Sequence, residues 1–79
     1  SLQYHKKRSE HWVIVDGKAS VILNNQNLIL QKGESIDIPL GAEHSLGNDT
    51  DKPLVVIEVQ LGSYFGEDDI IRLSDPYNR

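Results

Sequence analysis

The chain has 79 residues, 38% of them hydrophobic and 25% charged, with no cysteine and a formal net charge of −4. A chain this short forms at most one domain with a thin core, and its acidic balance argues against nucleic-acid binding, which needs a basic face. Because no apolar run approaches the ~20 residues that cross a bilayer, and no secretory leader is visible, we expect a soluble cytoplasmic protein with no membrane partner.

Short β-rich runs with period-two patterning alternate with turn signals along most of the chain, which is typical of a sandwich or barrel. We therefore expect an all-β domain whose barrel core covers residues 1–61. Asp16-Gly17 predicts a two-residue hairpin turn, and Asn24-Asn25 predicts a similar one. The expected strands are Leu2–His5, His11–Val15, Ala19–Leu23, Asn27–Leu30, Ser35–Ile38, His44–Leu46 and Leu54–Gln60.

The character of the sequence changes after Gln60. Three acidic residues at positions 67–69 precede an apolar pair at positions 70–71, and acidic residues stabilise the start of a helix. We expect residues 62–79 to form a short irregular or helical tail that packs on the barrel or on a neighbouring chain.

Four polar residues have the spacing of a metal site. Gln3 and His5 are two apart, so they share a face of an extended segment, and a short loop returns the chain to Glu10. His44 follows a turn rich in proline and glycine. Two imidazoles, a carboxylate and an amide oxygen suit a divalent metal such as zinc, with one position left open. Taken singly, each residue also fits an ordinary surface or packed position, so the spacing carries this prediction.

The spacing resembles that of the cupins, which implies a jelly-roll small β-barrel. Glu10 and Gly17 match the end of the first cupin motif, and the second motif is matched by Gly33, Pro39, Gly41, His44 and Asn48. Glutamine replaces the usual first histidine, which is the pattern of phosphomannose isomerases. In that resemblance zinc is held by Gln3, His5, Glu10 and His44.

Residues 1–19, 38–41 and 62–70 together resemble the C-terminal domain of type II mannose-6-phosphate isomerases. The resemblance implies metal-dependent aldose-ketose isomerisation of mannose 6-phosphate and fructose 6-phosphate through an enediol. In many members this domain follows a mannose-1-phosphate guanylyltransferase domain, so we expect an upstream nucleotidyltransferase domain and a role in GDP-mannose and polysaccharide biosynthesis. We also expect the barrel to be N-terminally truncated, which exposes an edge that favours a homodimer. An isolated fragment of this kind can be inactive while its parent is active.

Three further residues are candidates for chemistry. Arg8 can bind the substrate phosphate or stabilise an oxyanion, because guanidinium binds phosphate bidentately; a surface salt bridge is its ordinary role. Lys7 stands where family members commonly carry a second histidine and is a weaker phosphate-binding candidate. His11 is a candidate general acid or base, although it points away from Glu10 unless a bulge intervenes.

Two other functions compete with the isomerase. The chain could be a non-catalytic cupin that binds a sugar or nucleotide-sugar and regulates or scaffolds a partner, and metal dependence would separate this function from catalysis. A metal oxygenase is disfavoured, because those sites are usually rich in histidine and this one begins with Gln3.

Overall fold

The computed structural model describes residues 2–66 and 70–74, which form strands and turns and include no helix. The expected all-β class is confirmed. Within these residues, nothing has the helical length and apolar character that a membrane span requires. The strands are β1 (Leu2–His5), β2 (Arg8–Asp16), β3 (Lys18–Leu23), β4 (Gln26–Gln31), β5 (Ser35–Ile38), β6 (His44–Gly47), β7 (Val55–Gly62) and β8 (Ile70–Ser74).

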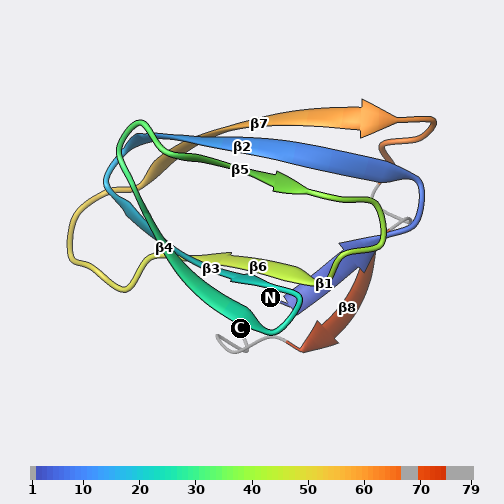
Figure 1. The fold of residues 1–79 in the computed structure, drawn as a ribbon, viewed down its shortest axis with the longest axis horizontal. Helices are drawn as coiled ribbons and strands as arrows, with labels where there is room; N and C mark the ends of the chain where they lie inside the picture. Colours follow the sequence, from blue (N-terminus) through green and yellow to red (C-terminus); the bar gives the residue numbers. More distant parts are fainter. Residues whose placement is uncertain (1, 67–69, 75–79) are drawn as a thin grey trace.

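The strands form two antiparallel sheets that face one another (Figure 1). One sheet has five strands in the order β4-β3-β6-β1-β8, and the other has three in the order β5-β2-β7. The first two strands of the chain therefore lie in opposite sheets. A short bend at residues 6–7 joins them, because β2 begins at Arg8, earlier than the expected start at His11.

The space between the sheets is filled from alternate positions of β2. From Arg8 to Ile14 the even-numbered side chains are buried, while the odd-numbered ones face outward and are partly exposed. This is the pattern of an antiparallel sheet with one face on the core. The buried hydrophobic cluster consists of Trp12, Ile14, Ala19, Val21, Ile38 and Ala42.

The two predicted turns differ in outcome. Asn24 and Asn25 have φ of 46° and 69°, the positive values that a type I′ turn requires, and they join the paired strands β3 and β4. The hairpin expected at Asp16-Gly17 is wrong, because β2 already pairs with β5 and β7 and leaves no edge for β3. Instead, Gly17 carries the chain between the sheets with a φ of 87°. A β-carbon there would collide with the Pro53 carbonyl oxygen.

The C-terminal segment also differs from expectation. Ile70–Ser74 form β8 instead of a helical turn, and this strand pairs antiparallel with β1 so that His5 lies opposite Ile70. The other edge of β1 pairs with β6, so β8 occupies the edge that β1 would otherwise leave unpaired, and β-branched isoleucine suits a strand. The other residues of the expected tail from position 67 onward, 67–69 and 75–79, lie outside the described residues.

Candidate metal centre

Polar side chains are buried at one end of the space between the sheets. His5 and His44 are each 3% exposed and Glu10 is 5% exposed. One ligand atom from each lies within 4.8 Å of the other two. Burying a carboxylate and two imidazoles is costly unless they are paired or bind a metal, so this cluster needs a functional explanation.

The cluster is assembled from three strands in both sheets. Gln3 on β1 lies opposite His44 on β6 in the strand register, and His5 follows two residues later on the same face of β1. Glu10 reaches the cluster from β2 in the opposite sheet. A turn places His44: the Gly41 amide donates to the His5 carbonyl (2.8 Å), and the Ala42 amide donates to the Pro39 carbonyl (3.0 Å).

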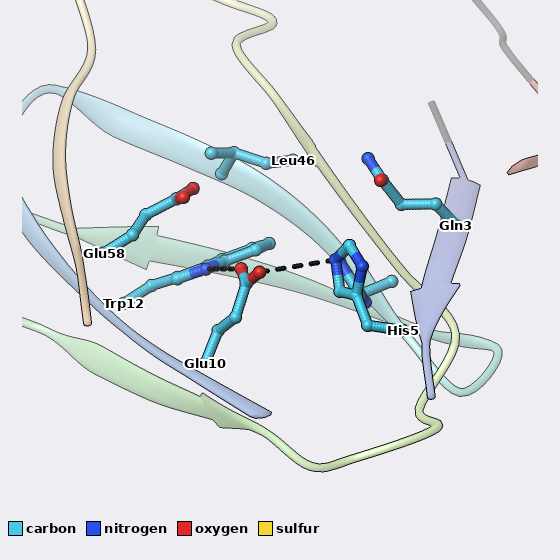
Figure 2. Close-up of a pocket in the computed structure, with 7 residues that line it drawn as sticks. Gln3, His5, Glu10, Trp12, Leu46 and Glu58 are labelled. Atoms are coloured by element: carbon cyan, nitrogen blue, oxygen red, sulfur yellow. Dashed lines mark hydrogen bonds and ion pairs between the residues drawn. The ribbon is translucent and has the colours of Figure 1, made fainter. Parts of the chain in front are cut away.

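A pocket of about 140 Å³ opens onto this cluster. Figure 2 shows Gln3 and Glu58 on opposite sides of the contact between Glu10 and His5. Gln3 projects from the same side of β1 as His5 and lines the same pocket. The pocket is lined by Gln3, His5, Glu10, Trp12, His44, Leu46 and Glu58.

Both oxygens of Glu10 are held by neighbouring side chains of β2. The Trp12 indole donates to Oε1 at 2.8 Å, and the Arg8 Nε donates to Oε2 at 3.0 Å. His5 Nε2 lies 3.3 Å from the same Oε2. These contacts orient the carboxylate towards His5.

His44 is oriented by its own turn. Its Nδ1 lies 3.0 Å from the Ala42 carbonyl oxygen, which can only accept, so Nδ1 carries the proton and Nε2 keeps its lone pair. A backbone carbonyl on the second nitrogen is the usual support of a metal-binding histidine. The ring packs edge-on to Trp12 with centroids 5.5 Å apart, which further fixes its direction.

Arg8 lies beside the cluster and outside the pocket lining. The residue is 7% exposed, and its guanidinium donates from Nη1 to the Phe65 carbonyl at 3.0 Å. Its Nη2 lies 3.3 Å from His5 Nε2. Because guanidinium has only donors, that contact uses the lone pair that a metal would take from His5.

The other two candidates lie away from the pocket wall. His11 is on the outer face of β2, where its Nδ1 lies 2.6 Å from Asp37 Oδ1, as strand parity predicts when no bulge intervenes at that position. Lys7 is exposed, and its Nζ lies 5.2 Å from the centre of the Tyr64 ring.

Glu58 is a pocket residue that the sequence reading missed. Burial raises its pKa, the charge of Glu10 raises it further, and Arg8 opposes the shift. The missed signal was the composition of its strand, because Glu58 is the single charged residue between Leu54 and Leu61. A single carboxylate on an otherwise apolar strand is a candidate functional residue, and the face of the sheet on which it lies should be predicted.

The donor set fits a divalent cation. Two imidazole nitrogens and a carboxylate oxygen converge within 4.8 Å, an amide lies beside them in the pocket lining, and the chain has no cysteine to supply a thiolate. Zinc takes nitrogen and oxygen ligands of these types and, at catalytic sites, keeps a position open. The open pocket provides access to such a position.

Comparisons with known proteins find related sequences along the whole chain. A family described as "Mannose-6-phosphate isomerase C-terminal" matches residues 1–75. The chain is 52% identical over its full length to a mannose-1-phosphate guanylyltransferase of Klebsiella pneumoniae and 48% identical to the alginate biosynthesis protein AlgA of Pseudomonas aeruginosa. It covers 17% and 16% of those two proteins, so it spans about one sixth of their length.

A solved structure supports the fold. A protein of Acidithiobacillus ferrooxidans, named as a candidate sugar phosphate isomerase, superposes with a TM-score of 0.69 at 23% identity. The match covers 75% of this chain and 38% of that one. At this identity the likeness concerns the fold alone, and it agrees with the cupin-type barrel implied by the sequence motifs.

Proposed function

The chain belongs to the mannose-6-phosphate isomerase C-terminal family, and from this premise we propose that it interconverts mannose 6-phosphate and fructose 6-phosphate with the help of a bound metal. The observation that carries the proposal is the buried group of His5, Glu10 and His44 at the base of an open pocket. Aldose-ketose isomerisation needs a polarised carbonyl and a mobile proton, and this pocket has groups suited to both needs.

In this proposal Gln3, His5, Glu10 and His44 hold the metal, and zinc is the ion that best suits them. Bound there, zinc would act as a Lewis acid that polarises the substrate carbonyl and stabilises the negative oxygen that develops. The protein's own contribution is to fix the ligands. Trp12 and Arg8 hold the Glu10 carboxylate, and the Ala42 carbonyl fixes the tautomer of His44.

The size of the pocket determines which part of the substrate enters. Its volume of about 140 Å³ is below the ~300–1,000 Å³ of pockets that enclose whole ligands. The C1–C2 end of an open-chain sugar therefore enters, while the phosphate stays outside near the surface. Lys7, in the connection between the two ligand-bearing strands, is proposed to contact the phosphate, and Arg8 places a second positive charge beside the reacting end. His11 has no role here, because it faces the outer surface with Asp37.

The relatives support a wider context for the same activity. Since proteins named for mannose-1-phosphate guanylyltransferase and for alginate biosynthesis contain a region like this chain, we propose that it acts beside a nucleotidyltransferase in supplying GDP-mannose for polysaccharides. A homodimer is proposed on separate grounds. Among the described residues no strand pairs with the outer edge of β7, and its outward residues Val55, Ile57, Val59 and Leu61 are 46–60% exposed. Such edges favour pairing with another chain.

The test combines metal content with activity. The purified chain and its His44→Ala variant are analysed for bound metals, and the longer parent protein, with and without the same substitution, is assayed for interconversion of the two sugar phosphates with and without a chelator. We expect one zinc per chain and chelator-sensitive activity in the wild type, with both lost in the variant. Binding of sugar phosphate without turnover, whatever the metal content, would show a binding cupin in place of an enzyme.

A further inference from the structure

Glu58 occupies a distinctive position in the candidate site. In the register of β2 and β7 it lies opposite Trp12, two residues from the Gln60 that lies opposite Glu10. It therefore projects from β7 to the same inner face as Glu10, and it lines the pocket. Figure 2 shows its carboxylate across the pocket from Gln3.

We propose that Glu58 is the catalytic acid-base residue that carries the proton between C2 and C1 of the sugar. This inference rests on the proposed isomerase function and adds to it the residue that performs the proton transfer. In this role Glu58 acts separately from metal binding. It is not among the potential ligands that lie within 4.8 Å of one another.

Elimination supports this assignment. In the proposed site His5, Glu10 and His44 hold the metal. The imidazoles then have no lone pair left to remove a proton from carbon, and both Glu10 oxygens already accept hydrogen bonds from Trp12 and Arg8. Among the pocket-lining residues in the described part of the chain, Glu58 is the remaining titratable group. His11 faces the opposite side of β2, and a guanidinium such as that of Arg8 stays protonated in proteins.

The surroundings of Glu58 suit a proton carrier. Burial and the nearby Glu10 charge raise its pKa, with Arg8 acting in the opposite direction, so in the metal-free chain it holds a proton more readily than a free glutamate does. Glu58 is also exposed at the mouth of the pocket, which lets protons exchange with solvent. The charged and titratable groups that surround it come from β2 (Glu10 and Arg8) and from across the pocket (His5 and His44).

The proposed step conserves atoms and electrons. The Glu58 carboxylate takes the proton from C2 of the open-chain aldose, the C2–H electron pair becomes the C1–C2 double bond, and the carbonyl pair moves to O1. The Glu58 carboxylic acid then returns a proton to C1, the O2 hydroxyl proton moves to O1, and the electron pair left on O2 closes the C2 carbonyl. Aldose and ketose are isomers, so no oxidant or reductant is consumed.

One carboxylate can serve both carbons, because C1 and C2 are adjacent and present the same face of a cis-enediol to the β7 side of the pocket. A proton held by an exposed carboxyl exchanges with water before it is returned. Isomerisation in deuterium oxide is therefore expected to place deuterium at C1 of fructose 6-phosphate. Turnover without any incorporated deuterium would indicate a direct hydride shift and would overturn the role of Glu58.

The experiment compares four zinc-loaded forms of the full chain: wild type, Glu58→Gln, Glu58→Ala and the control Glu34→Gln. The control removes the same charge in the turn between β4 and β5, where the Gln31 amide donates to the Glu34 side chain. Glu58→Gln is expected to lower kcat by about 10²- to 10⁴-fold with KM and zinc content unchanged, while the control retains wild-type kinetics. Formate is expected to restore part of the activity of Glu58→Ala, which a purely structural role would not allow.

The outcomes separate this inference from the function on which it rests. An active wild type with a Glu58→Gln kcat within about threefold of it overturns the role of Glu58 and leaves the isomerase standing. A longer parent protein that holds zinc at this site but converts neither sugar phosphate overturns both. If Glu58→Gln fails to fold, the absence of formate rescue in a folded, zinc-loaded Glu58→Ala decides against the inference.

Discussion

The inner face of β2 contains two contrasting regions. Arg8 and Glu10 at its start are charged and buried with His5 and His44, whereas Ile14 further along is fully buried in the apolar cluster. Trp12 lies between them, packing in the apolar cluster while its indole donates to Glu10. The apolar region stabilises the fold, because burial of apolar surface is favourable. The charged region is costly to bury unless its charges are compensated, so we assign it to function.

The contrast matters because the chain is small. Six hydrophobic residues and five polar or charged residues are buried among those described, so almost half of the interior positions contribute little hydrophobic stabilisation. We infer that the apolar cluster holds the barrel together and that the polar region gains most of its stabilisation from the metal. The variants Ile14→Ala and His44→Ala separate these two contributions.

The largest effect is expected at the apolar region. Ile14→Ala should destabilise the chain by roughly 2–5 kcal/mol, because it removes buried methyl groups and leaves a cavity, and the loss should be similar with and without zinc. Thermal or urea unfolding measures it. Ile29→Ala is the matched control, since Ile29 on β4 faces outward and is 57% exposed, and its cost should stay well below that of Ile14→Ala. Equal costs for the two variants would contradict the assignment of inner and outer faces.

The next effect belongs to the polar region and should depend on metal. Zinc at about 100 times its dissociation constant should stabilise the wild type by about 2.7 kcal/mol, because it binds the folded state alone. His44→Ala should remove most of that gain while changing the metal-free stability less. The measurement is the shift in Tm on adding zinc to each chain. A variant that gains as much from zinc as the wild type would show that His44 is not a ligand.

Trp12→Phe tests the residue that links the apolar region and the charged region on the inner face of β2. The change keeps an aromatic ring but removes the donor to Glu10 Oε1, and loss of a partner for a buried charged group costs about 1–3 kcal/mol. Zinc affinity should also fall by about 10- to 100-fold, as for other losses of support around metal ligands. A competition titration with a zinc dye measures it, with the outer-face variant His11→Gln as control. Wild-type affinity in Trp12→Phe would mean that the indole does not position Glu10.

The smallest effect is a pH dependence at Glu58. Its pKa in the folded chain is raised by burial, so the folded state binds its proton more tightly than the unfolded state does. The metal-free wild type should therefore lose stability relative to Glu58→Gln as pH rises from the usual glutamate value through the raised one. Unfolding of both chains from pH 4 to 8 measures the difference. A difference that grows in the wild type's favour with rising pH would contradict the sign of the shift.

Much of the fold was predictable because it depends on local patterns. The alternation along β2 and the asparagine turn at residues 24–25 arise from neighbouring residues, and both are confirmed. The hairpin predicted at Asp16-Gly17 was wrong because a local preference for a turn does not reveal which strands pair. Likewise, the acidic residues before Ile70 favoured a helix, whereas the unpaired edge of β1, distant in sequence, accommodates a strand.

The candidate site shows the same division. Motif spacing identified His5, Glu10 and His44, and the structure brings these three together. Spacing alone could not identify Glu58, because its relation to Glu10 depends on the register between β7 and β2. It also could not reveal that Arg8 contacts Glu10, His5 and the distant Phe65 carbonyl.

Zinc K-edge X-ray absorption on the zinc-loaded chain tests the central claim most directly, namely that the buried polar region is a metal centre. The account predicts one tightly held zinc with nitrogen and oxygen donors at about 2.0–2.2 Å and the outer-shell scattering of two imidazole rings, reduced to one ring in any zinc that His44→Ala retains. A spectrum of hydrated zinc without imidazole scattering, or a chain that releases all its zinc on desalting, would contradict it.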